Sequence, residues 1–255
     1  RHSLVARKAA GSNVARQVIA ANLDALFIVS SCNADFNAGR MERFLVLAAS
    51  AGVEPVVVLT KADTAENPES FVTQAQALKS GLAVVLMDAK RGDVRGQLAP
   101  WCGPGQTVAL LGSSGVGKTT IANALTGGAA AVQEVRDDDA KGRHTTTGRY
   151  LVAITDGGWL IDTPGMREVQ LSDAYDGIGL FFDDLTALSL TCKFRNCRHA
   201  GEPGCAVQGA IAAGDLDPAR LVRWQKLLAE DGTNTATMET SALRAAGRRF
   251  YPKKK

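Results

Sequence analysis

The sequence predicts an α/β protein: a mostly parallel sheet with helices on both faces, followed by a smaller, mostly helical domain. Between residues 24 and 162, apolar runs typical of buried strands alternate with segments of helical periodicity. Strands that are apolar throughout and alternate with helices are typical of a parallel sheet covered on both sides. From about residue 173 the composition changes to helical segments around a cysteine-rich loop.

The first part of the chain carries most of these elements. Residues 2–7 alternate like a strand but have no evident partner strand, and residues 13–22 predict a helix. Apolar runs and helical spacing then predict five elements in order: a strand at 24–31, a helix at 37–51, a strand at 54–60, a helix at 68–80 and a strand at 82–87. Residues 92–105 are rich in Gly and Pro and predict a connector.

The central feature is the sequence GSSGVGKT at 112–119, which follows an apolar run at 108–111 and precedes a helix-forming segment at 120–125. This is the G-x-x-x-x-G-K-[ST] phosphate loop in its required context of strand and helix. Glycines let consecutive backbone N–H groups turn toward phosphate oxygens. The alternative is a Gly/Ser-rich turn without a ligand. The predicted phosphate-binding residues are Gly112, Ser113, Ser114, Gly115, Val116, Gly117, Lys118, Thr119 and Thr120.

Beyond this loop the sequence is polar at 127–142 and then predicts a hairpin, with strands at 149–155 and 158–162 around the turn dipeptide Asp156-Gly157. Helices are expected at 181–190 and 218–230. We divide the chain into residues 1–11, a remnant of an upstream domain; residues 12–175, the α/β domain; and residues 176–255, the helical domain with a basic tail.

Composition excludes some classes of protein. No apolar run is as long as a membrane span, and the N-terminus lacks the apolar stretch of a signal peptide. The net charge of +3 is too small to argue by itself for nucleic-acid binding. Five cysteines, three of them between 192 and 205, favour a reducing compartment and a metal site over disulfides.

The predicted strand at 158–161 ends in D-x-x-G at 162–165. Asp162 is expected to hold Mg²⁺ together with Thr119, and the N–H of Gly165 to sense a γ-phosphate. A threonine of 145–147, here Thr146, is expected to complete the Mg²⁺ shell. Met166 stands where many GTPases place a water-orienting Gln, and Met cannot orient water. His144 is the candidate catalytic residue, which would position or activate the water. The alternative is that His144 has no catalytic role. Arg143 could instead stabilise phosphate charge.

Two further strand ends carry base-reading patterns. The strand at 54–60 ends in T-K-A-D at 60–63, similar to the N-K-x-D guanine reader with Thr in the place of Asn. A carboxylate such as that of Asp63 accepts two hydrogen bonds from guanine, but this residue or Thr64 is also a possible helix N-cap. The sequence D-A-K at 88–90 stands where GTPases have S-A-K. The predicted guanine-binding residues are Thr60, Lys61, Asp63, Ala89 and Lys90.

The order of these motifs is unusual, because the base-reading patterns precede the phosphate loop. A parallel sheet whose natural ends lie close together can be cut and rejoined without a change in packing. The order therefore predicts a circularly permuted P-loop GTPase domain.

The helical domain contains C-x₄-C-x-H-x₅-C. Three thiolates and one imidazole, with no open position, suit a structural tetrahedral Zn²⁺. Small buried cysteines beside an incidental histidine are the alternative. The predicted zinc ligands are Cys192, Cys197, His199 and Cys205.

Taken together, TKAD, DAK, GSSGVGKTT, GRHTTT, DTPGMRE and the C-x₄-C-x-H-x₅-C loop resemble the circularly permuted, ribosome small-subunit-dependent GTPase family RsgA, also called YjeQ, over residues 1–230. The resemblance implies a monomeric cytoplasmic hydrolase that converts GTP to GDP and uses Mg²⁺ and one structural Zn²⁺. It also implies action in late maturation of the 30S subunit, contact with 16S rRNA, stimulation by the subunit and release after hydrolysis. Members carry an N-terminal OB-fold domain, of which residues 4–8 would be the last strand.

Two other functions stay open from the residues alone. Because of Met166, one is a nucleotide-sensing RNA-binding adaptor with negligible hydrolysis. The other is an ATP-using P-loop enzyme, which the position of Asp63 disfavours.

Overall fold

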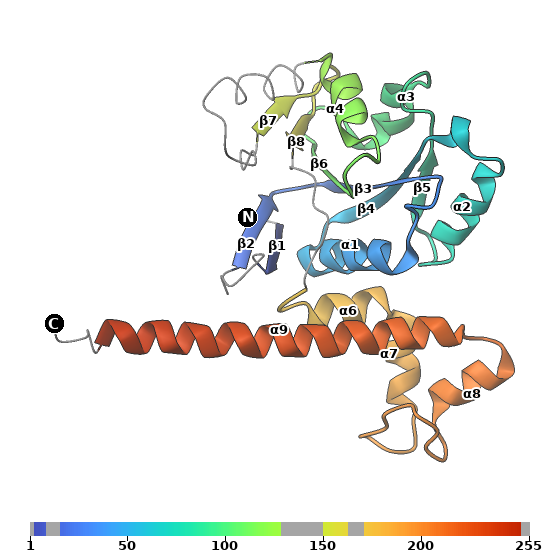
Figure 1. The fold of residues 1–255 in the computed structure, drawn as a ribbon, viewed down its shortest axis with the longest axis vertical. Coiled ribbons are helices and arrows are strands. Elements are labelled where there is room, and N and C mark those ends of the chain that lie inside the picture. Colours follow the sequence, from blue (N-terminus) through green and yellow to red (C-terminus); the bar gives the residue numbers. More distant parts are fainter. Residues whose placement is uncertain (1–2, 9–15, 129–149, 163–170, 251–255) are drawn as a thin grey trace. The chain divides into compact units, whose positions relative to one another are not determined.

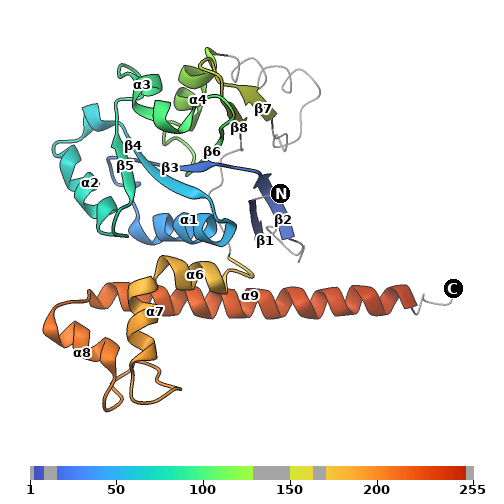
Figure 2. The same ribbon diagram turned by 180° about the vertical axis from the view of Figure 1, so that it is seen from behind.

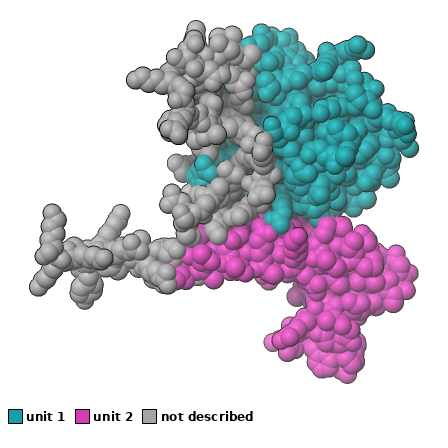
Figure 3. Space-filling model, viewed as in Figure 1, with its two compact units in different colours: residues 1–6, 17–169 teal, residues 7–16, 170–255 magenta. Residues whose placement is uncertain are grey.

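A computed structural model describes residues 3–8, 16–128, 150–162 and 171–250 of the chain (Figure 1). Two compact units divide these residues (Figure 3): the first comprises residues 1–6 and 17–169, and the second comprises residues 7–16 and 170–255. No described helix is long and apolar enough to cross a membrane.

A six-stranded sheet in the order β5-β4-β3-β6-β8-β7 forms the centre of the first unit. Its strands are β3 (Ala25–Ser31), β4 (Glu54–Thr60), β5 (Ala83–Leu86), β6 (Thr107–Leu111), β7 (Tyr150–Ala153) and β8 (Trp159–Asp162). All neighbouring pairs are parallel except β7 with β8, which form the predicted antiparallel hairpin. The prediction of a mostly parallel sheet is confirmed.

Helices cover both faces of this sheet. Helices α1 (Ala38–Ala51) and α2 (Pro68–Gln76) lie on one face, and α3 (Val94–Leu98) and α4 (Lys118–Thr126) lie on the other (Figure 2). Two short 3₁₀ turns, η1 (Ala62–Thr64) and η2 (Ala99–Trp101), complete the connections. In α1 the side chains of Met41, Phe44, Leu45 and Ala48 are buried at the spacing of a single helix face.

The core explains why the strands are apolar throughout. β3 is buried along its whole length, because helices cover it on both faces and strands flank it on both edges. One core layer is built from strand and helix side chains that include Phe27, Val58, Leu110, Ile121 and Leu125. This layer packs α4 against the central strands.

Two predictions about local structure were wrong. Residues 16–21 form a strand, β2 (Arg16–Ala21), instead of a helix, and β2 pairs with β1 (Leu4–Lys8) in a two-stranded sheet. Pairing with β1 and burial of Ile19 outweigh the helix propensity of the Ala and Arg residues. The connector at 92–105 contains α3, which begins where Asp93 accepts a hydrogen bond from the N–H of Gly96.

The second unit is helical. It contains α6 (Tyr175–Phe181), α7 (Asp183–Leu190), α8 (Ala206–Ala213) and α9 (Pro218–Phe250). α9 extends well beyond the helix predicted at 218–230. Its buried Leu221, Trp224 and Leu227 follow helical spacing, and α9 packs against α6. The loop between α7 and α8 carries the cysteines.

Candidate functional site

The parallel strands bring the predicted nucleotide-binding loops to one edge of the sheet. β4 and β6 flank β3 in parallel register, so Thr60 at the end of β4 and Leu111 at the end of β6 lie at the same edge. Ligands of open α/β sheets bind outside the carboxyl ends of the strands. The permuted order of the motifs therefore does not separate them in space.

Backbone conformation in the phosphate loop requires glycine. Gly112 has φ of 153°, and a Cβ atom there would lie 2.2 Å from the carbonyl oxygen of Val29. Gly117, with φ of 100°, is the N-cap of α4 and supplies no side-chain cap. The start of α4 is the end of the helix where negative charge is favoured, so it suits an anion.

Lys118 is folded back onto its own loop. Its ammonium group donates hydrogen bonds to the carbonyl oxygens of Gly112, at 2.9 Å, and Ser113. The side chains of Ser114 and Thr119 are exposed, and Val116 is buried beneath the loop. A bound phosphate would thus find a cation, the N-terminus of α4 and the hydroxyl of Thr119 on one small surface.

Thr60 ties the base-reading loop to the phosphate loop. Its buried hydroxyl lies 2.6 Å from the carbonyl oxygen of Val116 and 3.2 Å from that of Ser30. A hydroxyl has one hydrogen to donate, and the shorter contact identifies Val116 as its main acceptor. The side chain of Thr60 is therefore engaged with the protein and positions the two loops.

Asp63 follows in η1, where its carboxylate is exposed. The residue before η1 is Lys61, in the left-handed conformation at φ of 58°, and α2 is capped by Asn67. Within the described part of the chain, the side chain of Asp63 caps neither helix. The alternative interpretation, in which Asp63 is a helix N-cap, is therefore wrong.

The loop after β5 lies beside this segment, because the N–H of Ala62 donates to the carbonyl oxygen of Met87. Asp88, which replaces the expected Ser, accepts hydrogen bonds from the N–H groups of Lys90 (2.9 Å) and Arg91 (3.3 Å). Such an Asx turn fixes the backbone of Ala89 and Lys90. The loop is therefore ordered by Asp88, although this residue departs from the Ser of the family pattern.

Several predicted residues lie outside the described residues: His144, Arg143, the threonines at 145–147, Gly165 and Met166. Asp162 ends β8, next to the phosphate-loop strand β6. This is the sheet edge at which the phosphate loop also emerges.

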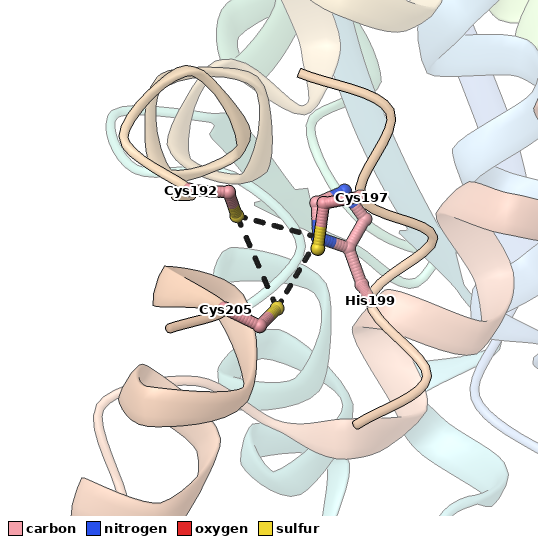
Figure 4. A group of neighbouring side chains, drawn as sticks. All are labelled: Cys192, Cys197, His199 and Cys205. Atoms are coloured by element: carbon pink, nitrogen blue, oxygen red, sulfur yellow. Dashed lines mark hydrogen bonds between the residues drawn. The ribbon is translucent and has the colours of Figure 1, made fainter. Parts of the chain in front are cut away.

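The four predicted zinc ligands converge in the second unit (Figure 4), where their ligand atoms all lie within 4.8 Å of one another. Nδ1 of His199 lies 3.6 Å from Sγ of Cys192 and 3.4 Å from Sγ of Cys205, and these two sulfur atoms are 3.9 Å apart. Tetrahedral Zn²⁺, with Zn–S of ~2.3 Å and Zn–N of ~2.1 Å, sets sulfur atoms roughly 3.8 Å apart and S and N roughly 3.6 Å apart. The arrangement fits such an ion.

Neighbouring groups hold His199 in place. Its backbone is in the left-handed region at φ of 59°, and the carboxylate of Glu202 accepts hydrogen bonds of 2.8 Å from the N–H groups of both flanking residues, Arg198 and Ala200. Gln208 donates to the carbonyl oxygen of His199, and the ring of Trp224 lies 5.7 Å from the imidazole ring. Glu202 and Gln208 were not predicted from the sequence, because such supporting contacts depend on the folded loop.

The cysteines differ in their electrostatics. Burial tends to raise the pKa of Cys192, but hydrogen bonds from the N–H groups of Val207 and Ala206 at the start of α8 outweigh it and lower the pKa. Burial, together with hydrogen bonds to the other thiols, raises the pKa of Cys197 to about 11. Burial raises the pKa of Cys32 to about 11 and that of Cys102 to about 12, as expected for inert structural thiols.

The family model for RsgA GTPase matches residues 1–172. The chain belongs to the RsgA GTPase family. A small ribosomal subunit biogenesis GTPase RsgA of Mesorhizobium japonicum is 56% identical over 223 residues, which cover 86% of this chain and 64% of the relative. RsgA 2 of Vibrio parahaemolyticus is 49% identical over 251 residues, which cover 98% of this chain and 70% of the relative. The chain thus spans about two thirds of the length of these RsgA proteins.

Solved structures support the same assignment of fold. YjeQ from Thermotoga maritima has a TM-score of 0.63 at 24% identity, covering 90% of this chain and 75% of its own. YloQ, described as a circularly permuted GTPase, has a TM-score of 0.60 at 25% identity, covering 86% of this chain and 71% of its own. The predicted fold, a permuted RsgA-type GTPase domain with a helical cysteine-containing domain, is confirmed.

Proposed function

We propose that this chain hydrolyses GTP to GDP and phosphate in late maturation of the small ribosomal subunit, and that the subunit stimulates hydrolysis and is then released. The observation that carries the GTP-binding part is the hydrogen bond from Thr60 to Val116, which holds the T-K-A-D segment against the phosphate loop. A nucleotide whose phosphates lie on Lys118 then has its base beside Asp63. The names of the relatives support the ribosomal part.

The proposed roles divide by part of the nucleotide. Residues 112–120 and Gly165 bind the phosphates, with Lys118 between the β- and γ-phosphates. Asp63 accepts two hydrogen bonds from the guanine edge, Lys61 lies along the base, and the backbone of Ala89 and Lys90 completes the pocket. Thr60 acts on this pocket by positioning its loops.

Two metal ions belong to the proposal. Thr119, Thr146 and Asp162 hold Mg²⁺, which supplies charge neutralisation at the phosphates. Cys192, Cys197, His199 and Cys205 would hold a structural Zn²⁺, because their ligand atoms lie within 4.8 Å of one another, and those of Cys192, His199 and Cys205 are spaced close to the tetrahedral values. His144 orients or activates the attacking water, since Met166 cannot.

The proposed partners are GTP, GDP, the 30S subunit and its 16S rRNA. We place the protein in the cytoplasm as a monomer, with residues 4–8 as the last strand of an upstream OB-fold domain.

The experiment that tests this function measures GTP hydrolysis by the chain, with and without purified 30S subunits, at low and moderate salt. Lys118→Ala serves as the matched inactive control, and ATP as the control nucleotide. Strong stimulation by 30S subunits supports the full proposal. If the chain binds GTP but does not hydrolyse it under any condition, the proposed hydrolase activity is overturned. The chain would then be a nucleotide-sensing adaptor. Equal use of ATP would overturn the role of Asp63.

A further inference from the structure

Arg40 occupies a place in α1 that does not favour a cation. It lies in the first turn, where Asn37 caps the helix by accepting a hydrogen bond from the N–H of Arg40 itself. Positive charge at a helix N-terminus is unfavourable, because the partial charge there is also positive. The contacts of its guanidinium group must offset this cost.

These contacts join α1 to the phosphate loop. Nη1 donates to the carboxylate of Asp35 at 3.0 Å and to the hydroxyl of Ser113, and Nη2 donates to the carbonyl oxygen of Asp35 at 3.1 Å. Ser113 is buried, and it lines a small hollow with Ser30, Asp35 and Arg40. The planar guanidinium can serve two partners at once, which an ammonium group does less well.

Ser113 also holds Lys118, together with Gly112. Its carbonyl oxygen accepts a hydrogen bond from the ammonium group of Lys118, while its hydroxyl accepts one from Arg40. Two cations from different elements therefore fix one residue of the phosphate loop. A shift of Ser113 would move one of the two acceptors that locate Lys118.

We propose that Arg40 is a positioning residue of the phosphate loop, which acts through Ser113 to hold Lys118 where it meets the phosphates. This inference rests on the proposed function. Interactions of Lys118 with the phosphates matter most in the transition state, where charge develops on the transferred group. Loss of positioning therefore lowers kcat more than it weakens nucleotide binding.

The test compares Arg40→Gln, Ser113→Ala, the double variant and Arg40→Lys in GTP hydrolysis, with thermal unfolding as a check on folding. We expect kcat to fall about tenfold in each single variant, with KM changed less than about threefold, because small misplacement of a reacting group is costly. The double variant should be no slower than either single variant, because both remove the same interaction. Arg40→Lys should recover part of the rate.

Asp35→Asn is the matched control, because it keeps Arg40 and its bond to Ser113. If Arg40 only braces the start of α1, Asp35→Asn should reproduce Arg40→Gln, and the effects of Arg40→Gln and Ser113→Ala on kcat should multiply in the double variant. That result would overturn the inference alone, since the unchanged protein still hydrolyses GTP. An unchanged protein that neither binds nor hydrolyses GTP would overturn both the inference and the proposed function.

Discussion

The hydroxyl of Thr60 lies 2.6 Å from the carbonyl oxygen of Val116 and joins two loops that are 56 residues apart in the chain. Thr60 is 1% exposed, so water cannot replace this bond. Many GTPases have Asn at this position of the motif. Here the shorter Thr reaches the backbone of Val116, which is followed by Gly117 in a conformation that favours glycine, with φ of 100°.

Replacing Thr60 by Val should weaken this tie while keeping the shape of the side chain. Without the hydroxyl of Thr60, the buried carbonyl oxygen of Val116 loses its hydrogen bond. This loss lowers the free energy of unfolding by about 1–3 kcal/mol. GTP and GDP affinity should fall together, because both need the two loops in register. Urea unfolding and nucleotide titration measure the effects. Thr60→Ser, which keeps the hydroxyl, is the control, and a fall in GTP affinity alone would contradict the positioning role.

Replacing Asp63 by Asn should change the preferred base from guanine to xanthine. The carboxylate accepts from the N–H and NH₂ groups of guanine, whereas an amide accepts from one N–H and donates to the carbonyl group of xanthine. We expect GTP to bind at least about 100-fold more weakly and XTP to bind more tightly, since two hydrogen bonds to a charged group are lost. Competition binding with both nucleotides measures this. Unchanged GTP affinity would remove Asp63 from the base site.

How much of this site the sequence could predict depends on the range of the interactions. The phosphate loop was predictable because its glycines, Lys118 and following helix are consecutive in the chain. The zinc ligands also lie within 14 residues of one another, counted from Cys192 to Cys205. Arg40 was not predictable, because its partner Ser113 is 73 residues away and the contact exists only once β3 and β6 pair. Residues 16–21 were mistaken for a helix for a similar reason, since their partner strand was not recognised.

Replacing Cys197 by Ser should release the metal from the second unit. Removing one thiolate from a four-ligand site lowers affinity strongly, and metal binding contributes to folding of such loops. Metal content and thermal unfolding of the full chain measure the loss. Cys102→Ala, which removes a buried thiol outside the cluster, should keep the metal. Full metal content in Cys197→Ser would show that Cys197 is not a ligand.

Replacing Glu202 by Gln should loosen the turn that presents His199. The carboxylate accepts from two N–H groups with two oxygens, and a Gln side chain has one oxygen to offer. Metal affinity should fall roughly 10-fold or more, as for other groups that support a ligand without touching the metal. A competition titration with a chelator measures it. Glu230→Gln in α9 is the matched control, and equal affinity in both variants would assign Glu202 no role in the site.

The pair of Asp184 in α7 and Arg220 in α9 should make the second unit sensitive to acid. Arg220 donates to both carboxylate oxygens, at 2.8 and 2.9 Å, and its guanidinium group lies 4.7 Å from the ring centre of Phe182. Burial tends to raise the pKa of Asp184, but the hydrogen bonds and charge of Arg220 outweigh it and lower the pKa.

Because the folded-state pKa is lowered, the carboxylate contributes stability at every pH above its unfolded-state value of about 3.9, and this contribution is lost as pH falls through the folded-state value. The side chain of Asp184 is 43% exposed, so solvent keeps the contribution small, about 1 kcal/mol or less. Asp184→Asn should therefore be less stable than the unchanged chain at pH 7, with the difference shrinking below about pH 4. Urea unfolding midpoints between about pH 3 and pH 7 measure it for both chains, and the comparison cancels any loss of metal that they share.

Arg220→Met keeps the apolar stem over Phe182 and should behave like Asp184→Asn at neutral pH. A difference that stays constant down to the lowest pH would show that the pair does not stabilise the charged form of Asp184.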